Sequence, residues 1–183
     1  MGAGANDALQ QARIERVEEH VRLENAHDLD ALMETFSAAP YYDEEPWSEH
    51  HVGHEAVRRR HEQLFGAAPD IFIAVCRRHA AREAIILECE IRGTHEGPWR
   101  GLPPTGRRIA FPLCVVYGFE DGDKLAGERI YYDRATVLNQ LGVMHEPASL
   151  LGRVTTTLTH PITLGGALAR RARSKPRRDG GGN

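Results

Sequence analysis

Two stretches decide the fold: Ala84–His95, with the sequence Ala-Ile-Ile-Leu-Glu-Cys-Glu-Ile-Arg-Gly-Thr-His, and Leu125–Asp133, with the sequence Leu-Ala-Gly-Glu-Arg-Ile-Tyr-Tyr-Asp. In the first, apolar and charged residues alternate with a period of two, which is typical of a half-buried antiparallel strand. Each stretch ends in an ionisable side chain, His95 or Asp133, and the second runs directly into a short helical pattern. The sequence therefore predicts strands that lead to a pocket closed by proton-transfer groups.

The first third of the chain predicts three helices. Residues 7–27 contain no Gly or Pro and place apolar residues at helical spacing, which predicts an amphipathic helix. Asp28 is a suitable N-cap for a second helix with Phe36 on its apolar side. Residues 40–46 read as a short extended segment, and a third helix follows Gly53.

Strands dominate the middle of the chain. Besides the two stretches above, residues 71–79 and 108–119 are predicted strands, and the second is almost entirely apolar, so we expect it to be central. A last helix over residues 134–141 should stop at Gly142. Helices followed by an antiparallel meander indicate an α+β fold.

Length and composition predict one globular domain with a terminal extension, and the end of the helix and strand pattern places the domain at residues 1–146 and the extension at residues 147–183. The chain has 183 residues, of which 41% are hydrophobic and 27% charged. One helix is possible after Pro161, and the basic stretch 170–178 is expected to be solvated and disordered.

The net charge, the N-terminal sequence and the cysteines indicate which classes of partner and which location to expect. A net charge of −3 gives no general reason to expect a nucleic acid or membrane partner. The N-terminus lacks the features of a secretion signal. The three cysteines lie apart in strand-like runs, which predicts reduced, buried thiols and a cytoplasmic protein.

Asp133 and His95 are the candidate catalytic residues. An aspartate that faces an apolar cavity has a raised pKa and can exchange protons near neutral pH. The alternative is that Asp133 is only the N-cap of the helix that it precedes. His95 could orient a carboxylate or donate a hydrogen bond to an enolate, or it could be a structural histidine.

Aromatic and histidine side chains are candidates for the wall of the pocket, although core or rim packing would explain each of them. The candidate substrate-binding residues are Tyr131, His61, Trp47, Trp99, Tyr41 and Phe36. His50, His51 and His54 could supply metal ligands, but Gly53 and the start of a helix divide them. We expect no metal and no cofactor.

Several motifs resemble the SnoaL-like polyketide cyclases of the nuclear transport factor 2-like superfamily. They are Gly93-Thr-His-Glu-Gly, Gly101-Leu-Pro-Pro-Thr-Gly-Arg107, Glu128 through Asp133, and Gln140-Leu-Gly142. The resemblance implies a cone-shaped, curved antiparallel sheet wrapped around the N-terminal helices, and a dimer formed through the sheet. It also implies that Asp133 is the general acid/base of a metal-free aldol closure, with His95 as the pocket histidine. The stretch from Tyr42 to His51 and the C-terminal extension depart from the family.

Three functions remain open at this point. The leading hypothesis is a cofactor-free enzyme that removes a proton alpha to the carbonyl of a hydrophobic, polyketide-like or polycyclic substrate and so promotes cyclisation or isomerisation. The first alternative is a binding or assembly module of the same fold without chemistry. The second is an epoxide hydrolase, because Asp133 and Arg134 could form a carboxylate–guanidinium pair.

Assembly is predicted from the two apolar faces of residues 108–119. One face can line the cavity of the domain, and the other then needs a cover, because large exposed apolar patches are uncommon on monomers. A second copy that packs sheet against sheet would cover it in a two-fold dimer. The alternative is a monomer in which residues 150–168 cover the same face.

Overall fold

The computed structural model describes residues 2–120, 122–146, 148–163, 165–166 and 170. Contacts divide the chain into two units, one that ends at Leu141 and one that begins at Gly142. The first unit combines helices with one six-stranded sheet, as expected for an α+β fold. Its helices are α1 (Gly2–Asn25), α2 (Leu29–Glu34), the 3-10 helix η1 (Glu45–Trp47), α3 (His54–Ala67) and α4 (Arg134–Gln140).

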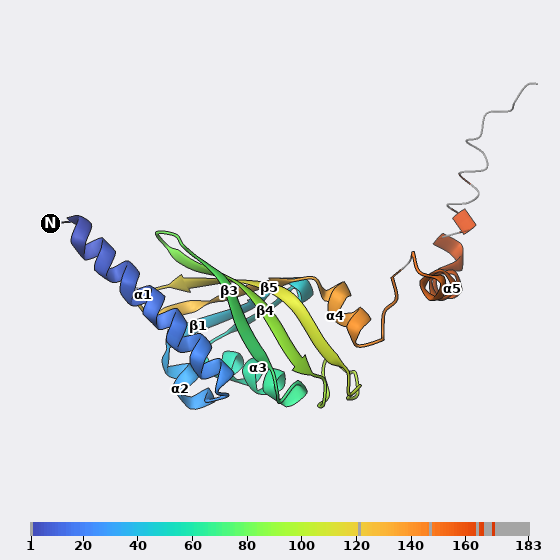
Figure 1. Ribbon diagram of the computed structural model, residues 1–183, viewed down its shortest axis with the longest axis horizontal. Helices are drawn as coiled ribbons and strands as arrows, with labels where there is room; N and C mark the ends of the chain where they lie inside the picture. The colour runs from blue at the N-terminus through green and yellow to red at the C-terminus, as the bar shows by residue number, and fades with distance from the viewer. Residues whose placement is uncertain (1, 121, 147, 164, 167–169, 171–183) are drawn as a thin grey trace, which may run out of the picture. The chain divides into compact units, whose positions relative to one another are not determined.

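The sheet is curved and unclosed, and its order is β2-β1-β6-β5-β4-β3. The strands are β1 (Phe36–Glu44), β2 (Glu49–Val52), β3 (Phe72–Ala80), β4 (Ala84–Thr94), β5 (Arg108–Phe119) and β6 (Leu125–Tyr132). All neighbours are antiparallel except β1 and β6, which are parallel. The predicted meander of β3 to β6 is confirmed, with β5 in the interior of the sheet. Helices α1 to α3 lie against the sheet in Figure 1.

The first helix carries its buried residues in one stripe. Val17, His20, Val21 and Glu24 follow the helical spacing of three and four residues, and all four are buried. At the end of the helix, the side-chain amide of Asn25 donates to the Ile73 carbonyl at 3.0 Å, and its oxygen accepts from the Ile73 amide at 2.7 Å. These bonds attach α1 to β3.

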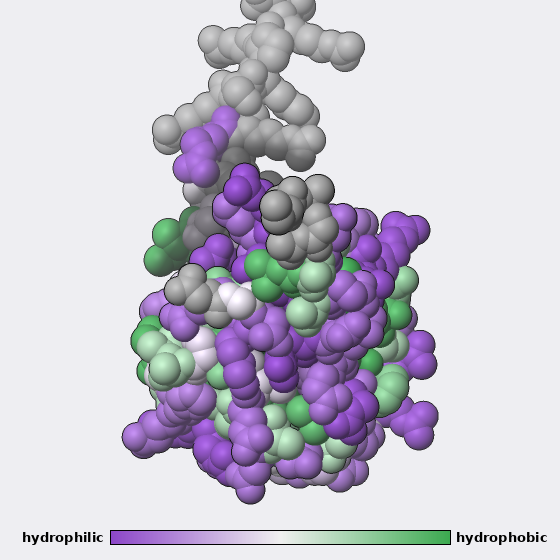
Figure 2. Space-filling model, turned by 90° about the vertical axis from the view of Figure 1, so that its left-hand side faces the viewer, coloured by the Kyte–Doolittle hydropathy of each residue, from purple (hydrophilic) through white to green (hydrophobic). Residues whose placement is uncertain are grey.

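The face of the molecule in Figure 2 is mainly hydrophilic, with small separate hydrophobic areas.

The Gly-Thr-His-Glu-Gly motif fixes the end of β4 against α3. The backbone amides of Glu96 and Gly97 both donate to the Ala67 carbonyl at 3.0 Å. A Cβ on Gly97 would lie 1.9 Å from the carbonyl oxygen of Gly66, so only glycine permits this approach. His95 is thereby held next to the C-terminal end of α3.

The second unit contains helix α5 (Leu150–Thr159), whose N-cap is Ser149. Residues 161–163 and 165–166 are also helical, so helical structure begins before Pro161, earlier than the sequence pattern predicts. The basic stretch 170–178 is expected to be disordered, but residues 171–178 lie outside the described part of the chain. In that part, no helix is both long enough and apolar enough to cross a membrane.

Candidate active site

An apolar cavity of about 90 Å³ lies between the helices and the sheet. Its walls come from α1, α3, α4 and the inward faces of β1, β3, β4, β5 and β6. Most of the lining is aliphatic or aromatic, and few polar groups interrupt it, which is the usual composition of a small-molecule site. The titratable residues in the lining are Glu24, Tyr42, Glu44, Arg60, His95, Tyr117, Glu128 and Tyr132.

Two buried carboxylates in the lining have opposite electrostatic environments. Burial raises the pKa of Glu24, and the neighbouring charge of Glu128 raises it further. Burial alone would also raise the pKa of Glu128, but His20 and His61 lower it to about 2. Carboxyl groups whose pKa values are pushed apart in this way are typical of acid/base sites. Glu24 is the group that this environment prepares for proton transfer.

Two tyrosines in the cavity wall stay protonated over the whole physiological range. Burial raises the pKa of Tyr42 and of Tyr117 well above the usual value, and the charges of Glu24 and Glu128 contribute to both shifts. Each phenol is therefore a neutral O–H donor within electrostatic reach of Glu24. Neutral hydroxyl donors of this kind can stabilise an oxyanion.

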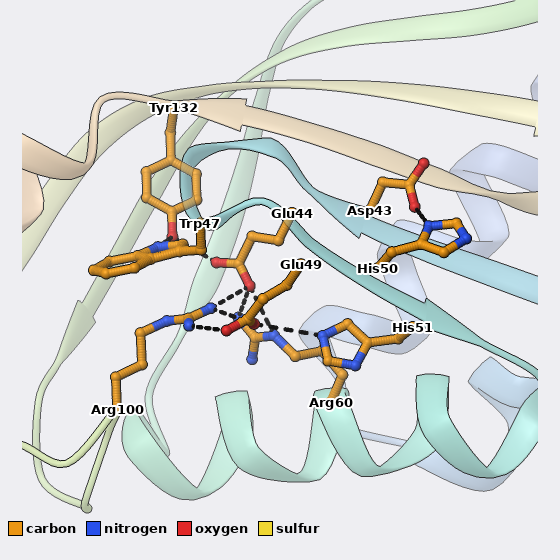
Figure 3. Close-up of polar contacts among 9 residues, drawn as sticks. All are labelled: Asp43, Glu44, Trp47, Glu49, His50, His51, Arg60, Arg100 and Tyr132. Atoms are coloured by element: carbon orange, nitrogen blue, oxygen red, sulfur yellow. Dashed lines mark hydrogen bonds and ion pairs between the residues drawn. The ribbon is translucent and has the colours of Figure 1, made fainter.

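A polar network around Glu44 forms another part of the wall (Figure 3). The Glu44 carboxylate accepts from Arg60 Nε at 2.9 Å, from Arg100 Nη2 at 2.8 Å and from the Tyr132 hydroxyl at 2.5 Å. Trp47 Nε1 in turn donates to the Tyr132 hydroxyl at 2.6 Å. Glu44 is only 1% exposed, so its charge is compensated inside the protein.

Arg100 links this network to two tryptophans. Its guanidinium lies 4.2 Å from the ring centroid of Trp47 and 5.4 Å from that of Trp99, and it also pairs with Glu49. The two indole rings meet edge to face at 5.5 Å. Because Trp99 lines the cavity, these contacts hold one wall in place.

His95 lines the cavity, as the sequence predicts, and its protonation pattern can be deduced. The Thr105 backbone amide donates to Nδ1 at 3.3 Å, so Nδ1 is an acceptor and Nε2 carries the hydrogen of the neutral ring. Burial lowers the pKa of His95, which favours that neutral ring. Nε2 is buried and has no hydrogen-bond partner within the described residues. It is a donor available to a ligand.

Asp133 does not face the cavity. Its carboxylate caps α4, accepting from the amides of Ala135 at 2.9 Å and Thr136 at 3.3 Å and from the Thr136 hydroxyl at 2.7 Å. The Thr136 hydroxyl and these amides lower its pKa, whereas a cavity-facing carboxylate was expected to have a raised one. Arg134 extends to the Pro46 carbonyl and the Trp47 ring rather than forming the carboxylate–guanidinium pair of an epoxide hydrolase. The geometry is that of the N-cap alternative.

The other predicted wall residues divide into three groups. Trp99 lines the cavity. Trp47 does not line it, but its ring packs edge to face against the ring of Trp99. His61 and Phe36 are buried in the core beside the cavity. Tyr131 and Tyr41 do not line it: Tyr131 is 44% exposed, because it shares the outer face of β6 with Asp133.

The histidines around β2 do not converge. The ring of His50 pairs with Asp43, whereas His51 lies 3.5 Å from Glu49. His54 Nε2 instead lies 2.7 Å from the Ser37 carbonyl. Within the described residues, these three side chains form no common metal site.

Sequence reasoning missed most of the polar residues of the cavity. Asp133 and Tyr131 were predicted to face the pocket, but by the period of two they share the outer face of β6, and Glu128 and Tyr132 on the opposite face line the cavity. A signal for Glu24 and His20 was present, because both continue the helical stripe of Val17 and Val21. No local signal could have brought Arg60 and Arg100 to Glu44.

Solved structures with the same fold include proteins of three bacteria. The AclR protein of Streptomyces galilaeus is 24% identical, with a TM-score of 0.63 over 73% of this chain and 97% of that chain. A SnoaL-like protein of Jannaschia sp. CCS1 is 19% identical, with a TM-score of 0.67 over 74% and 94%. A Catenulispora acidiphila protein with a ketosteroid isomerase-like fold is 16% identical, with a TM-score of 0.61 over 70% and 93%. These likenesses confirm the expected nuclear transport factor 2-like fold.

The family is shown by the sequence itself. No protein among the curated sequences matches this chain. The family model of the SnoaL-like polyketide cyclases, however, matches residues 13–141, which include every residue of the cavity wall. The chain therefore belongs to the SnoaL-like polyketide cyclase family, and this membership supports a cyclase-type function.

Proposed function

We propose that the protein is an acid/base enzyme that removes a proton alpha to the carbonyl of a hydrophobic, ring-bearing substrate and so promotes cyclisation or isomerisation. The observation that carries the proposal is the pairing of a buried carboxylate, Glu24, with neutral hydrogen-bond donors in one apolar cavity. A carboxylate with a raised pKa is a stronger base than an exposed one. Neutral donors can stabilise an enolate without competing for the proton.

Each residue has a separate role in the proposed reaction. Glu24 accepts the alpha proton, and the hydroxyl of Tyr42 or Tyr117 donates to the enolate oxygen as negative charge develops there. His95, through Nε2–H, holds a second oxygen of the substrate. This assignment moves the base from Asp133, which is capped and solvent-exposed, to Glu24, which faces the cavity.

Hydrogen–deuterium exchange of 2-tetralone in D2O tests the proposal, because exchange at its acidic alpha carbon requires only proton removal. Proton NMR should show faster exchange with the wild type than in buffer. Glu24→Gln should lower the enzymatic rate by about 10²- to 10⁴-fold, the usual contribution of a general base. His95→Gln is expected to raise KM more than it lowers kcat, because His95 positions the substrate.

Asp133→Asn is the matched control, because asparagine also caps a helix and removes the same charge. It should exchange 2-tetralone at the wild-type rate. Loss of exchange in Asp133→Asn with full exchange in Glu24→Gln would return the base to Asp133. No acceleration by the wild type would overturn proton abstraction from this class of ketone.

The small, mainly apolar cavity also suits a binding module without chemistry, which is the second candidate function. The two functions are distinguished by comparing the binding of 2-naphthol with the exchange rate of 2-tetralone. A binding module would take up 2-naphthol, the planar mimic of the enol of 2-tetralone, and would leave the exchange rate of the ketone unchanged.

A further inference from the structure

Three buried polar atoms converge beside the cavity without a hydrogen-bond partner among the described residues. They are Nε2 of His20 on α1, Nε2 of His61 on α3 and Oε1 of Glu128 on β6. The two nitrogens lie 3.5 Å and 3.6 Å from the Glu128 oxygen. One ligand atom from each residue lies within 4.8 Å of the other two. Orphaned groups at this depth are costly, so the cluster requires a partner.

The other ring nitrogens determine where the imidazole hydrogens are. His61 Nδ1 lies 2.9 Å from the Val57 carbonyl, which can only accept, so Nδ1 carries the hydrogen. His20 Nδ1 lies 2.7 Å from the Thr35 hydroxyl, which already donates to the Leu32 carbonyl at 2.6 Å. That hydroxyl must therefore accept from His20 Nδ1–H. In the neutral rings both Nε2 lone pairs point to the Glu128 oxygen. Burial opposes a charge on His61, but Glu128 raises the pKa of that ring, so either a proton or a metal ion at Nε2 would satisfy the contact.

Lone pairs that face a carboxylate repel one another unless a positive charge lies between them. Direct imidazolium–carboxylate bonds would be about 2.7 to 2.9 Å long, and the observed separations are longer. A tetrahedral metal ion with bonds of about 2.1 Å holds its ligand atoms about 3.4 Å apart. The two measured separations match that spacing closely.

We propose that His20, His61 and Glu128 bind a divalent transition metal ion such as Zn²⁺. Two imidazole nitrogens and one carboxylate are a common ligand set that leaves further positions open. The Thr35 hydroxyl and the Val57 carbonyl would orient the rings, as outer partners of metal-bound histidines do. Because Glu128 also lines the cavity, the ion would lie next to the space that a ligand fills.

The ion would also balance charge in this part of the protein. Glu24 and Glu128 are both buried, and their repulsion contributes to the raised pKa of Glu24. A cation near them favours ionised Glu24, the form that accepts a proton. The site goes beyond the proposed reaction and differs from the expectation that the protein binds no metal. It stands whether or not Glu24 is the base.

Zinc binding to the full-length protein tests the site. The protein, purified without a histidine tag and treated with a chelator, is dialysed against ZnCl2 and analysed by mass spectrometry of the metal and by anomalous diffraction at the zinc edge. We expect one zinc per chain, with the anomalous peak between the three side chains. His61→Gln and Glu128→Gln should lose it, and Thr35→Val should weaken it about 10- to 100-fold.

His95→Gln is the matched control, because it changes a cavity histidine outside the cluster and should retain the zinc. The absence of an anomalous peak at the cluster in the wild type would overturn the site, and this test requires no variant to fold. A folded Glu128→Gln protein with zinc still at the cluster would also overturn it. Zinc binding without 2-tetralone exchange would contradict only the proposed function, and exchange without zinc binding would contradict only the metal site.

Discussion

Replacement of Glu44 by Gln should destabilise the protein strongly, because it leaves a buried guanidinium without its carboxylate. Arg60 is 5% exposed and donates to Glu44 through Nε at 2.9 Å. Burial opposes its charge, but Tyr42 and Glu44 raise the pKa of Arg60, so it stays protonated. Breaking a buried pair by removal of one partner costs about 3 to 5 kcal/mol.

That cost corresponds to a drop in melting temperature of about 6 to 20 °C, at about 2 to 4 °C per kcal/mol for a domain of this size. Urea unfolding followed by circular dichroism gives the free energy directly. Glu45→Gln is the control, because Glu45 is 46% exposed and pairs with Arg129 at the surface. It should change the free energy of unfolding by less than about 1 kcal/mol.

A second variant separates the loss of the pair from a loss of packing. Glu44→Gln combined with Arg60→Met removes the charge of Glu44 and that of its most deeply buried partner, while Arg100, the other guanidinium on Glu44, keeps Glu49 as its partner. Replacement of both members of a buried pair is often nearly neutral. The double variant should therefore be more stable than Glu44→Gln alone. A cost below about 1 kcal/mol for Glu44→Gln would contradict a buried, coupled pair. A double variant as unstable as the sum of its single changes would contradict it too.

Four further outcomes follow from the same contacts. Gly97→Ala should cost at least about 1 to 3 kcal/mol in urea unfolding, because its Cβ would meet the Gly66 carbonyl, and an unchanged midpoint would contradict the close approach. The Thr94 hydroxyl and amide lower the pKa of Asp70 in the folded protein, so the ionised carboxylate stabilises the folded state. This stabilisation is present above the ordinary aspartate pKa of about 3.9 and is lost as the pH falls below it. The difference in the free energy of unfolding between the wild type and Asp70→Asn should therefore become smaller from pH 6 to pH 3, and a constant difference would argue against these bonds. Asp133→Ala should lower the urea midpoint and Asp133→Asn should lower it much less, because asparagine also caps a helix, whereas equal shifts would argue against the cap. We also propose a two-fold dimer through the outer face of the sheet, for which light scattering at micromolar concentration should give twice the mass of one chain and not a single-chain mass.

The fold was largely predictable because its signals are local. The alternation of β4, the apolar run of β5 and the cap at Asp28 each depend on neighbours in the sequence, and all three appear in the structure. The strand β2 and the parallel pairing of β1 with β6 were not predicted. The pairing of β1 with β6 depends on contacts between residues far apart in the chain, for which a single sequence carries no pattern, whereas β2 pairs locally with β1 but is only four residues long and does not alternate apolar and polar residues.

The site was predicted less well, and β6 shows why. A period of two separates Glu128, Ile130 and Tyr132 from Tyr131 and Asp133, but it does not say which face is buried. Charged residues are seldom fully buried unless they are paired, so Glu128 indicated that its face of the strand is exposed to solvent. Glu128 lies inside because His20 and His61, from two different helices, lie against it.

A crystal structure of the complex with 2-naphthol shows directly whether ligands bind in the cavity at Glu24, the claim that separates this assignment from one at Asp133. We expect the naphthol ring to lie among the aliphatic residues of the cavity. Its hydroxyl oxygen should lie within about 2.6 to 3.2 Å of a tyrosine hydroxyl, Tyr42 or Tyr117, with the Glu24 carboxylate facing the adjacent carbon. A naphthol molecule bound outside the cavity, against Asp133 and Tyr131 on the outer face of β6, would contradict it.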